Sequence, residues 1–169
     1  LAFLNSGVTI IFRDERLETP KEEVLIYEGG INEFVKNIDE GKNVIPAEPI
    51  YIYEKKDDVI TEISMHYNTS YVENIRTYVN DINTRDGGTH LDGFKNALTF
   101  VLNKCLESNE KLKKQFEKDT SDKSKKGEDK GEKLMGEDVR SGLTCVISMK
   151  VPEPEFVGQT KDKLGNTEV

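Results

Sequence analysis

The chain contains no tryptophan, two cysteines and two histidines among its 169 residues. It has no CxxC pair, and His66 and His90 complete no zinc-binding spacing, so the sequence predicts no zinc site. Cys105 and Cys145 are most simply explained as structural thiols in a reducing compartment, with a disulfide between them as the alternative. No apolar run approaches the length that spans a bilayer, so the sequence predicts no membrane segment.

Hydrophobic residues are scarce at 35%, whereas charged residues reach 33%. The length suffices for one domain with a core. The low hydrophobic and high charged content predicts that part of the chain lies outside that core, exposed to solvent. The net charge of -8 argues against a uniformly basic nucleic-acid-binding surface but leaves room for a local basic patch. The chain does not begin with Met, and we interpret it as a piece of a longer polypeptide whose targeting signals cannot be judged.

Hydrophobic periodicity predicts strands separated by short loops and two or three helices. Alternating or β-branched apolar residues predict strands at residues 8–12, 25–27, 50–53, 59–67, 75–79 and 143–151. Helical stripes predict helices at residues 31–38, 91–105 and, as a short turn, 136–140, with Leu1 to Asn5 as a helix end. Thr89, followed by Asp92, predicts an N-cap for the long helix. The whole favours an α+β fold whose single sheet is covered on one face.

Two charged segments interrupt this pattern. Residues 13–23 contain Pro20 and are interpreted as a linker. Residues 107–133 hold nine lysines and eight acidic residues and show no periodicity, which predicts an exposed, flexible insertion. Because its charges nearly balance, this insertion is a weak candidate for contacting nucleic acid.

The glycine turn at residues 83–90 (NTRDGGTH) follows a predicted strand and precedes the long helix. Consecutive glycines allow positive φ and leave space for a phosphate or another chain segment, and Arg85 could hold a phosphate oxygen. The alternative is an ordinary strand-to-helix turn with a solvated arginine, because no complete P-loop or Rossmann fingerprint is present. His90 is a candidate acid or base by residue type, with local hydrogen bonding at a helix start as the alternative.

The second candidate segment is the loop that contains Gln159, Thr160 and Lys161, after two prolines. A lysine on such a loop can reach a phosphate bound elsewhere, and a neighbouring glutamine can orient water or donate a second hydrogen bond. The alternative is a solvated surface lysine. The sequence offers no carboxylate dyad, serine triad or metal cluster.

Four motifs occur in one order along the chain: residues 27–31 (YEGGI), 83–90 (NTRDGGTH), 136–143 (GEDVRSGL) and 159–165 (QTKDKLG). Together they resemble the transducer domain of the B subunits of type IIA DNA topoisomerases. The B subunit of DNA gyrase is the nearest resemblance, and the B subunit of topoisomerase IV is a close second. The similarity covers the chain except for the charged insertion at residues 107–133, which is longer and more charged than usual in the family.

The resemblance implies a two-layer sheet-and-helix domain of the ribosomal protein S-five domain 2 type, with a left-handed βαβ crossover. Residues 1–18 would be the tail of a preceding GHKL-type ATPase domain, and residues 19–169 the transducer. The implied partners are DNA, the A subunit of gyrase and a second copy of the B subunit in an A2B2 complex, with no membrane. ATP and Mg²⁺ would bind mainly outside this chain. The implied location is the bacterial cytoplasm near the nucleoid, or a plastid if the source is a parasite or plant.

The resemblance also assigns roles to individual residues. Gln159 and Lys161 would be catalytic by reaching the γ-phosphate of ATP, and Gln159, Thr160 and Lys161 would form the cofactor-binding loop. Arg85 would face DNA. The complete protein would be an ATP-hydrolysing topoisomerase that supercoils DNA, and this chain alone would be inactive. Two alternatives remain: a non-catalytic nucleic-acid-binding or assembly module of the same fold, and a middle domain from a mismatch-repair protein of the same ATPase superfamily.

Overall fold

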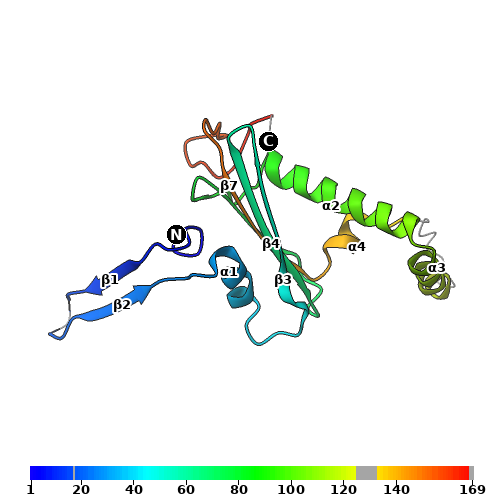
Figure 1. The fold of residues 1–169 in the computed structure, drawn as a ribbon, viewed down its shortest axis with the longest axis horizontal. Helices are drawn as coiled ribbons and strands as arrows, with labels where there is room; N and C mark the ends of the chain where they lie inside the picture. The colour runs from blue at the N-terminus through cyan, green and yellow to red at the C-terminus, as the bar shows by residue number, and fades with distance from the viewer. Residues whose placement is uncertain (17, 125–132, 168–169) are drawn as a thin grey trace.

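The computed structural model of the chain describes residues 1–16, 18–124 and 133–167, and it confirms the α+β class. Figure 1 shows a twisted sheet with helices beside it and a hairpin that extends away from it. The elements follow in the order β1 (Ile10–Asp14), β2 (Lys21–Leu25), α1 (Gly30–Ile38), β3 (Val44–Lys56), β4 (Val59–Asn68), β5 (Asn74–Val79), β6 (Ile82–Asn83), α2 (Thr89–Ser108), α3 (Glu110–Ser124), α4 (Gly136–Arg140) and β7 (Leu143–Lys150).

The main sheet has five strands in the order β3-β4-β7-β5-β6. β7 pairs antiparallel with β4 and parallel with β5, and the chain passes from β5 to β7 through α2. This is a βαβ crossover, whose left-handed sense stays a prediction. A tight turn joins β3 to β4, in which Asp57 and Asp58 have φ of 49° and 65°, as a two-residue hairpin turn requires.

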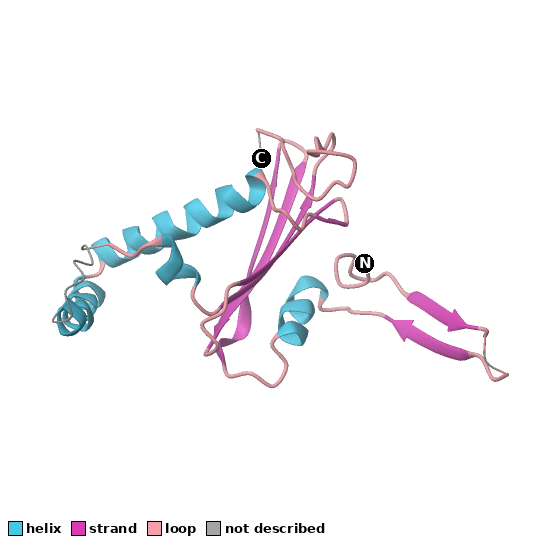
Figure 2. Ribbon diagram, turned by 180° about the vertical axis from the view of Figure 1, so that it is seen from behind, coloured by secondary structure: helices cyan, strands magenta, loops and turns pink. Residues whose placement is uncertain are grey.

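The sheet carries helices on both faces, as Figure 2 shows from behind. Cys145, Ile147 and Met149 of β7 belong to a core that includes side chains of α2, whereas Val146 packs with α1 on the opposite face. The sequence predicts cover on one face only, and α1 supplies the second. The physical reason lies in β7, whose side chains are buried at every position except the last and therefore need cover on both sides.

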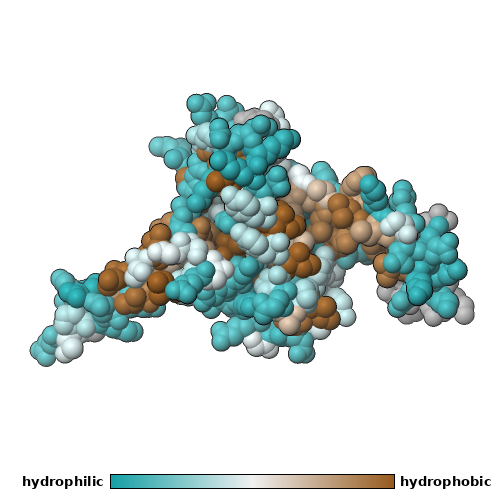
Figure 3. Space-filling view, viewed as in Figure 1, coloured by the Kyte–Doolittle hydropathy of each residue, from teal (hydrophilic) through white to brown (hydrophobic). Residues whose placement is uncertain are grey.

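The predicted linker at residues 13–23 is wrong, because these residues form the two inner ends and the connecting turn of an antiparallel hairpin of β1 and β2. Arg13 lies opposite Glu22 in the register, and their side chains form an ion pair of 2.6 Å. Charged residues can therefore build a strand where cross-strand partners are complementary. Figure 3 shows apolar side chains gathered over this hairpin, where Ile11 and Phe12 are exposed. The domain boundary at residue 18 falls in the hairpin turn and stays a prediction.

The charged insertion contains a helix that its sequence pattern did not predict. α2 continues to Ser108, and after Asn109 the fifteen residues of α3 run from Glu110 to Ser124. The side chain of Asn109 accepts hydrogen bonds from the backbone N–H groups of Lys111 and Leu112, which caps the start of α3. Residues 125–132 lie outside the described residues, so the predicted flexibility there is untested.

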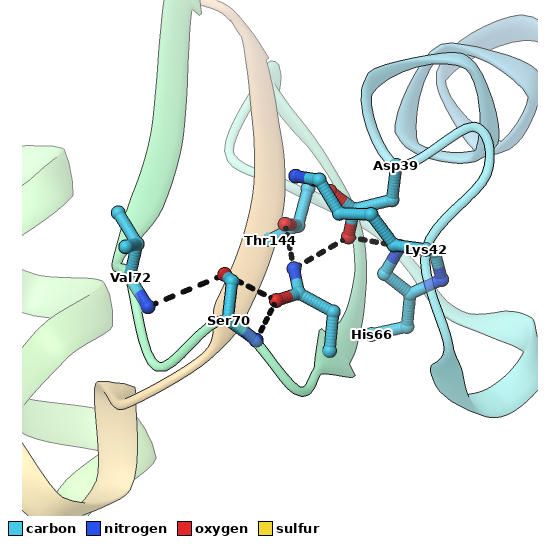
Figure 4. A network of polar contacts seen from close by, with 7 residues as sticks. Asp39, Lys42, His66, Ser70, Val72 and Thr144 are labelled. Atoms are coloured by element: carbon cyan, nitrogen blue, oxygen red, sulfur yellow. Dashed lines mark hydrogen bonds and ion pairs between the residues drawn. The ribbon is translucent and has the colours of Figure 1, made fainter.

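A buried polar cluster joins the end of α1 to the sheet (Figure 4). We call it the Asp39 cluster; its members are Asp39, Lys42, His66, Asn68 and Thr144. The Asp39 carboxylate lies 2.9 Å from His66 Nε2, and it accepts hydrogen bonds of 2.8 Å from both Lys42 and Asn68. Burial alone would raise the pKa of Asp39, but the bonds from Lys42, Asn68 and Thr144 outweigh it and lower that pKa.

Two smaller expectations are settled by the structure. Leu1 to Asn5 form a single turn, in which the Leu4 and Asn5 N–H groups donate to the Leu1 carbonyl, in place of the predicted helix end. Cys105 and Cys145 are free thiols, so the alternative of a disulfide is wrong. Among the described residues, no helix is long and apolar enough to cross a membrane.

Candidate functional site

The glycine turn and the Gln-Thr-Lys loop, which are far apart in sequence, lie side by side in the structure. The Asp86 N–H donates to the Asp162 carbonyl at 2.9 Å. The Leu164 N–H donates to the Gly87 carbonyl at 3.0 Å, and the Thr89 N–H donates to the Leu164 carbonyl at 3.2 Å. Two motifs that the sequence singled out separately therefore form one surface, which we call the turn–loop site.

Gly88 makes this approach possible. Its φ is 131°, and a Cβ added there would lie 2.6 Å from Leu164 N and closer still to Leu164 O. Any other residue would therefore be strained and would push the two segments apart. The close approach that the paired glycines predict is made here by another segment of the chain, and Leu164 is fully buried beneath it.

Arg85 lies on the exposed side of the site and is anchored to the loop. Its Nε donates to Asp162 Oδ1 at 3.1 Å, while 74% of its side chain remains accessible. The pKa of Asp162 is lowered chiefly by a hydrogen bond from Thr160 and then by Arg85. One carboxylate therefore connects the predicted DNA-facing residue to the middle residue of the Gln-Thr-Lys loop.

The loop presents Gln159, Thr160 and Lys161 to solvent. Its base is held by hydrogen bonds from Val157 N–H to the Lys163 carbonyl at 2.8 Å and from Gly165 N–H to the Glu155 carbonyl at 2.7 Å. Lys161 has a φ of 58°, which is uncommon for a residue with a Cβ, and its Nζ lies 5.9 Å from the centre of the Phe156 ring. The exposed ammonium and the neighbouring amide are both donors, so this loop suits a phosphate ligand brought by an adjoining body.

His90 lies behind the turn and serves its structure. It is buried, and its Nε2 lies 3.2 Å from the Thr84 hydroxyl, which in turn lies 2.7 Å from the Thr77 hydroxyl. Burial lowers the pKa of His90 and favours its neutral form. Of the two alternatives for His90, these contacts favour local hydrogen bonding at the helix start over a role as acid or base. The sequence did not indicate that Thr77 and Thr84 form a hydrogen-bonded chain to His90, since threonines in strands and turns carry no distinctive pattern.

The predicted N-cap of α2 is wrong. The helix begins at Thr89, the capping position is Gly88, and no side chain in the described part of the chain caps it. The Thr89 hydroxyl is buried without a hydrogen-bond partner among the described residues. The backbone contact with Leu164 takes the place of the cap, because the Thr89 N–H already donates to Leu164. Within the described ranges, no group of three His, Cys, Asp or Glu residues is arranged to hold a metal ion.

Comparison with protein families identifies a match to the family model described as DNA gyrase B over residues 30–169. Among curated relatives, the B subunit of DNA gyrase from Treponema denticola is 53% identical over the whole chain, and that from Staphylococcus epidermidis is 47% identical. The chain covers 25% and 24% of those two proteins, so it spans about a quarter of their length.

Solved structures agree with this family. The 43K ATPase domain of Thermus thermophilus gyrase B, solved with an aminocoumarin, superposes with a TM-score of 0.74 at 34% identity, covering 99% of this chain and 40% of that one. The ATP-binding domain of Francisella tularensis topoisomerase IV, solved with a small-molecule inhibitor, gives a TM-score of 0.71 at 27% identity, covering the same shares. Both structures contain the fold described above as a part of a larger unit.

Proposed function

The chain belongs to the DNA gyrase B family, and we propose that within it this chain is the transducer, which couples the nucleotide state of an adjoining ATPase domain to DNA strand passage. The complete protein would be part of an ATP-dependent type IIA topoisomerase that supercoils DNA. The relatives are about four times longer, so that activity would need the rest of the polypeptide and its partners, and this chain alone would be inactive.

The observation that carries the proposal is the direct connection between the Gln-Thr-Lys loop and the glycine turn. Thr160 and Arg85 share the Asp162 carboxylate, and the turn's backbone is bonded to the loop at Asp86 and Gly87. A movement of the loop would therefore move Arg85 with it. Such a connection is what a domain needs if it is to report nucleotide state to a DNA-facing surface.

The fit of the loop to ATP rests on its donors. The Lys161 ammonium would form a charge-assisted hydrogen bond with the γ-phosphate, and the Gln159 amide could donate a second one. The bound nucleotide would supply the terminal phosphate whose removal ends these contacts. Because Lys161 would then bind one nucleotide state and not the other, the loop would shift the equilibrium between two domain arrangements. The Mg²⁺ that accompanies the nucleotide would be held mainly by residues outside this chain.

Partners and location follow from the same proposal. DNA, the A subunit of gyrase and a second copy of the B subunit in an A2B2 assembly would be the partners. The identities of 47–53% to gyrase proteins support gyrase over topoisomerase IV, and the bacterial sources of these relatives support the bacterial cytoplasm over a plastid. The alternative, a non-catalytic nucleic-acid-binding or assembly module of this fold, would use Arg85 but would have no need of the exposed Gln159 and Lys161.

The test is the substitution Lys161→Ala in the full-length protein assembled with its partner. We expect ATP hydrolysis to fall about 100-fold or more, as when one preorganised donor to a developing charge is removed. Lys163→Ala is the matched control, because Lys163 is a second lysine of the same loop and has no proposed contact with the nucleotide. Normal hydrolysis by Lys161→Ala would refute nucleotide sensing by this loop and would favour the non-catalytic module.

A further inference from the structure

The base of the Gln-Thr-Lys loop is closed by Asn166, a residue that none of the four sequence motifs includes. Asn166 follows the loop and is buried, with 1% of its surface accessible. Its Oδ1 accepts a hydrogen bond of 2.7 Å from the Glu155 N–H, and its Nδ2 donates one of 3.0 Å to the Glu153 carbonyl. The amide therefore joins the end of the loop to the segment that begins it.

The Asn166 amide occupies the place that a neighbouring strand would take. Residues two apart in an extended segment present their N–H and C=O groups to the same side, as Glu153 and Glu155 do here. An asparagine amide carries both an acceptor and donors, so it can satisfy both groups at once. Because Pro152 and Pro154 have no N–H, a regular strand cannot continue β7 through this segment, and a side chain supplies the pairing instead.

The loop is built upward from this base by backbone contacts. Phe156 and Leu164 pair in an antiparallel bridge, and at the tip the Lys161 N–H donates to the Gly158 carbonyl at 3.4 Å. Leu164 is fully buried, whereas Gln159 and Lys161 are exposed. The buried base therefore sets the position of the exposed tip.

The base also fixes the loop relative to the rest of the domain. Leu164 forms a parallel bridge with Gly88, at the start of α2, and Figure 1 shows the C-terminal segment, in red, beside that end of the helix. Asn166 holds the opposite side of the loop base, two residues further on. A cation on a loop held in this way loses little freedom on binding, so Lys161 is positioned before a ligand arrives.

We propose that Asn166 is a positioning residue for the Gln-Thr-Lys loop, and that its amide holds the loop in the conformation in which Lys161 and Gln159 meet the terminal phosphate of ATP. The ligand rests on the proposed function, whereas the hold on the loop base rests on the two hydrogen bonds of Asn166. Asn166 would act through the loop backbone and would not itself contact the nucleotide.

The experiment compares the binding of two nucleotides to the full-length protein with the substitution Asn166→Ala. The probes are the β,γ-imido analogue of ATP, which has a terminal phosphate, and ADP, which lacks it. We expect the affinity for the analogue to fall about tenfold, as the loss of a hydrogen bond to a charged group predicts, and the affinity for ADP to stay unchanged. ATP hydrolysis should fall as well, because a misplacement of about 1 Å slows the reaction.

Asn103→Ala is the matched control. The Asn103 side chain also makes both kinds of bond with the backbone, donating to the Leu134 carbonyl at 3.0 Å and accepting from the Leu134 N–H at 2.9 Å. It joins α2 to the segment before α4, away from the loop. Its loss should lower thermal stability without changing the preference for the analogue over ADP.

A second variant decides the question if Asn166→Ala does not fold. Asn166→Asp has the same shape and keeps the acceptor for the Glu155 N–H, but it loses the donor to the Glu153 carbonyl. The preference for the analogue over ADP should therefore fall in this variant too.

Two outcomes would overturn the inference. The first is a preference for the analogue over ADP in the Asn166 variants equal to that of Asn103→Ala, because the loop would then keep its position without the amide. The second is an equal loss of affinity for both nucleotides, which would make the effect a general structural one. The proposed function fails separately, through normal hydrolysis by Lys161→Ala. A lost preference in Lys161→Ala beside a normal one in Asn166→Ala would refute the role of Asn166 alone.

Discussion

The Asp39 cluster and the turn–loop site are both built around one carboxylate, and they differ in burial. Asp39 is inaccessible to solvent and contacts Lys42, His66 and Asn68. Asp162 keeps 19% of its side chain accessible and contacts Arg85 and Thr160. Both carboxylates have a lowered pKa, Asp39 against the effect of burial and Asp162 mainly through Thr160. Similar polar chemistry is thus placed once inside the fold and once at its surface.

The difference in burial assigns the two groups different roles. A buried carboxylate with buried polar partners is strongly destabilising to remove, because the partners that lose it keep their desolvation cost. A surface ion pair exchanges readily with water and contributes little to stability. The surface group can therefore exchange partners, whereas the Asp39 cluster fixes α1 onto the sheet.

The largest expected effect is that of Asp39→Ala. Because His66 and Asn68 are buried and lose their shared acceptor, we expect the free energy of unfolding to fall by about 3–5 kcal/mol. Urea denaturation of the 169-residue chain measures it. Asp39→Asn keeps the shape and one acceptor oxygen, so it should cost less than Asp39→Ala.

Asp162→Ala is the matched variant at the surface, and it should leave the unfolding midpoint nearly unchanged. Equal losses of stability for Asp39→Ala and Asp162→Ala would contradict the claim that burial gives the two carboxylates different roles.

Strands with clean alternation and helices with a clear stripe were predictable from sequence. The pattern at residues 59–67 confirms this, since Ile63, Met65 and Tyr67 pack into one core as expected. The hairpin β1–β2 and α3 were not predictable in this way. The Arg13–Glu22 ion pair stabilises the hairpin, while the cap by Asn109 and the contact with α2 stabilise α3, and none of these produces hydrophobic periodicity.

The candidate site was predictable as two motifs but not as one site. The glycine pair indicated a close approach without specifying that Leu164 makes it. The Asp39 cluster was missed, because its members come from several elements whose proximity depends on the sheet order. Asp39, His66 and Thr144, for example, come together only because β4 and β7 are neighbours and α1 ends above them.

The second prediction concerns the backbone contact that holds the turn–loop site. Gly88→Ala introduces a Cβ against Leu164 and a strained backbone, so we expect the free energy of unfolding to fall by about 3 kcal/mol. Hydrogen exchange should show loss of protection at the Leu164 and Thr89 N–H groups, which make the contact.

Gly41→Ala is the control, because it measures the free-energy cost of a positive φ without a steric clash. Gly41 has a φ of 78° with no atom within 4 Å of an added Cβ, so its cost should be about 1–2 kcal/mol. A cost for Gly88→Ala equal to that of Gly41→Ala would show that the surface site does not depend on close packing against Leu164.

The smallest expected effect is a pH dependence of the free energy of unfolding that comes from His90, which is buried behind the turn–loop site. Burial lowers the folded-state pKa of His90 below its ordinary value of 6.5. Between these two pKa values the unfolded chain binds a proton that the folded chain does not, so stability rises with pH there. The contribution is complete above about pH 6.5 and decreases as the pH falls below it, by at most about 1.4 kcal/mol per pH unit.

Urea denaturation at about pH 7.5 and about pH 5.5 measures this effect, with His90→Gln as the comparison. Wild type should lose more stability than His90→Gln on acidification, because glutamine does not titrate. Asp39, Glu73 and Asp162 also have lowered pKa values, but their contributions are lost only near and below about pH 4, outside this range. Parallel pH profiles for the two proteins would show that His90 accepts a proton in the folded chain as readily as in the unfolded one, and hence that the group behind the glycine turn can carry charge.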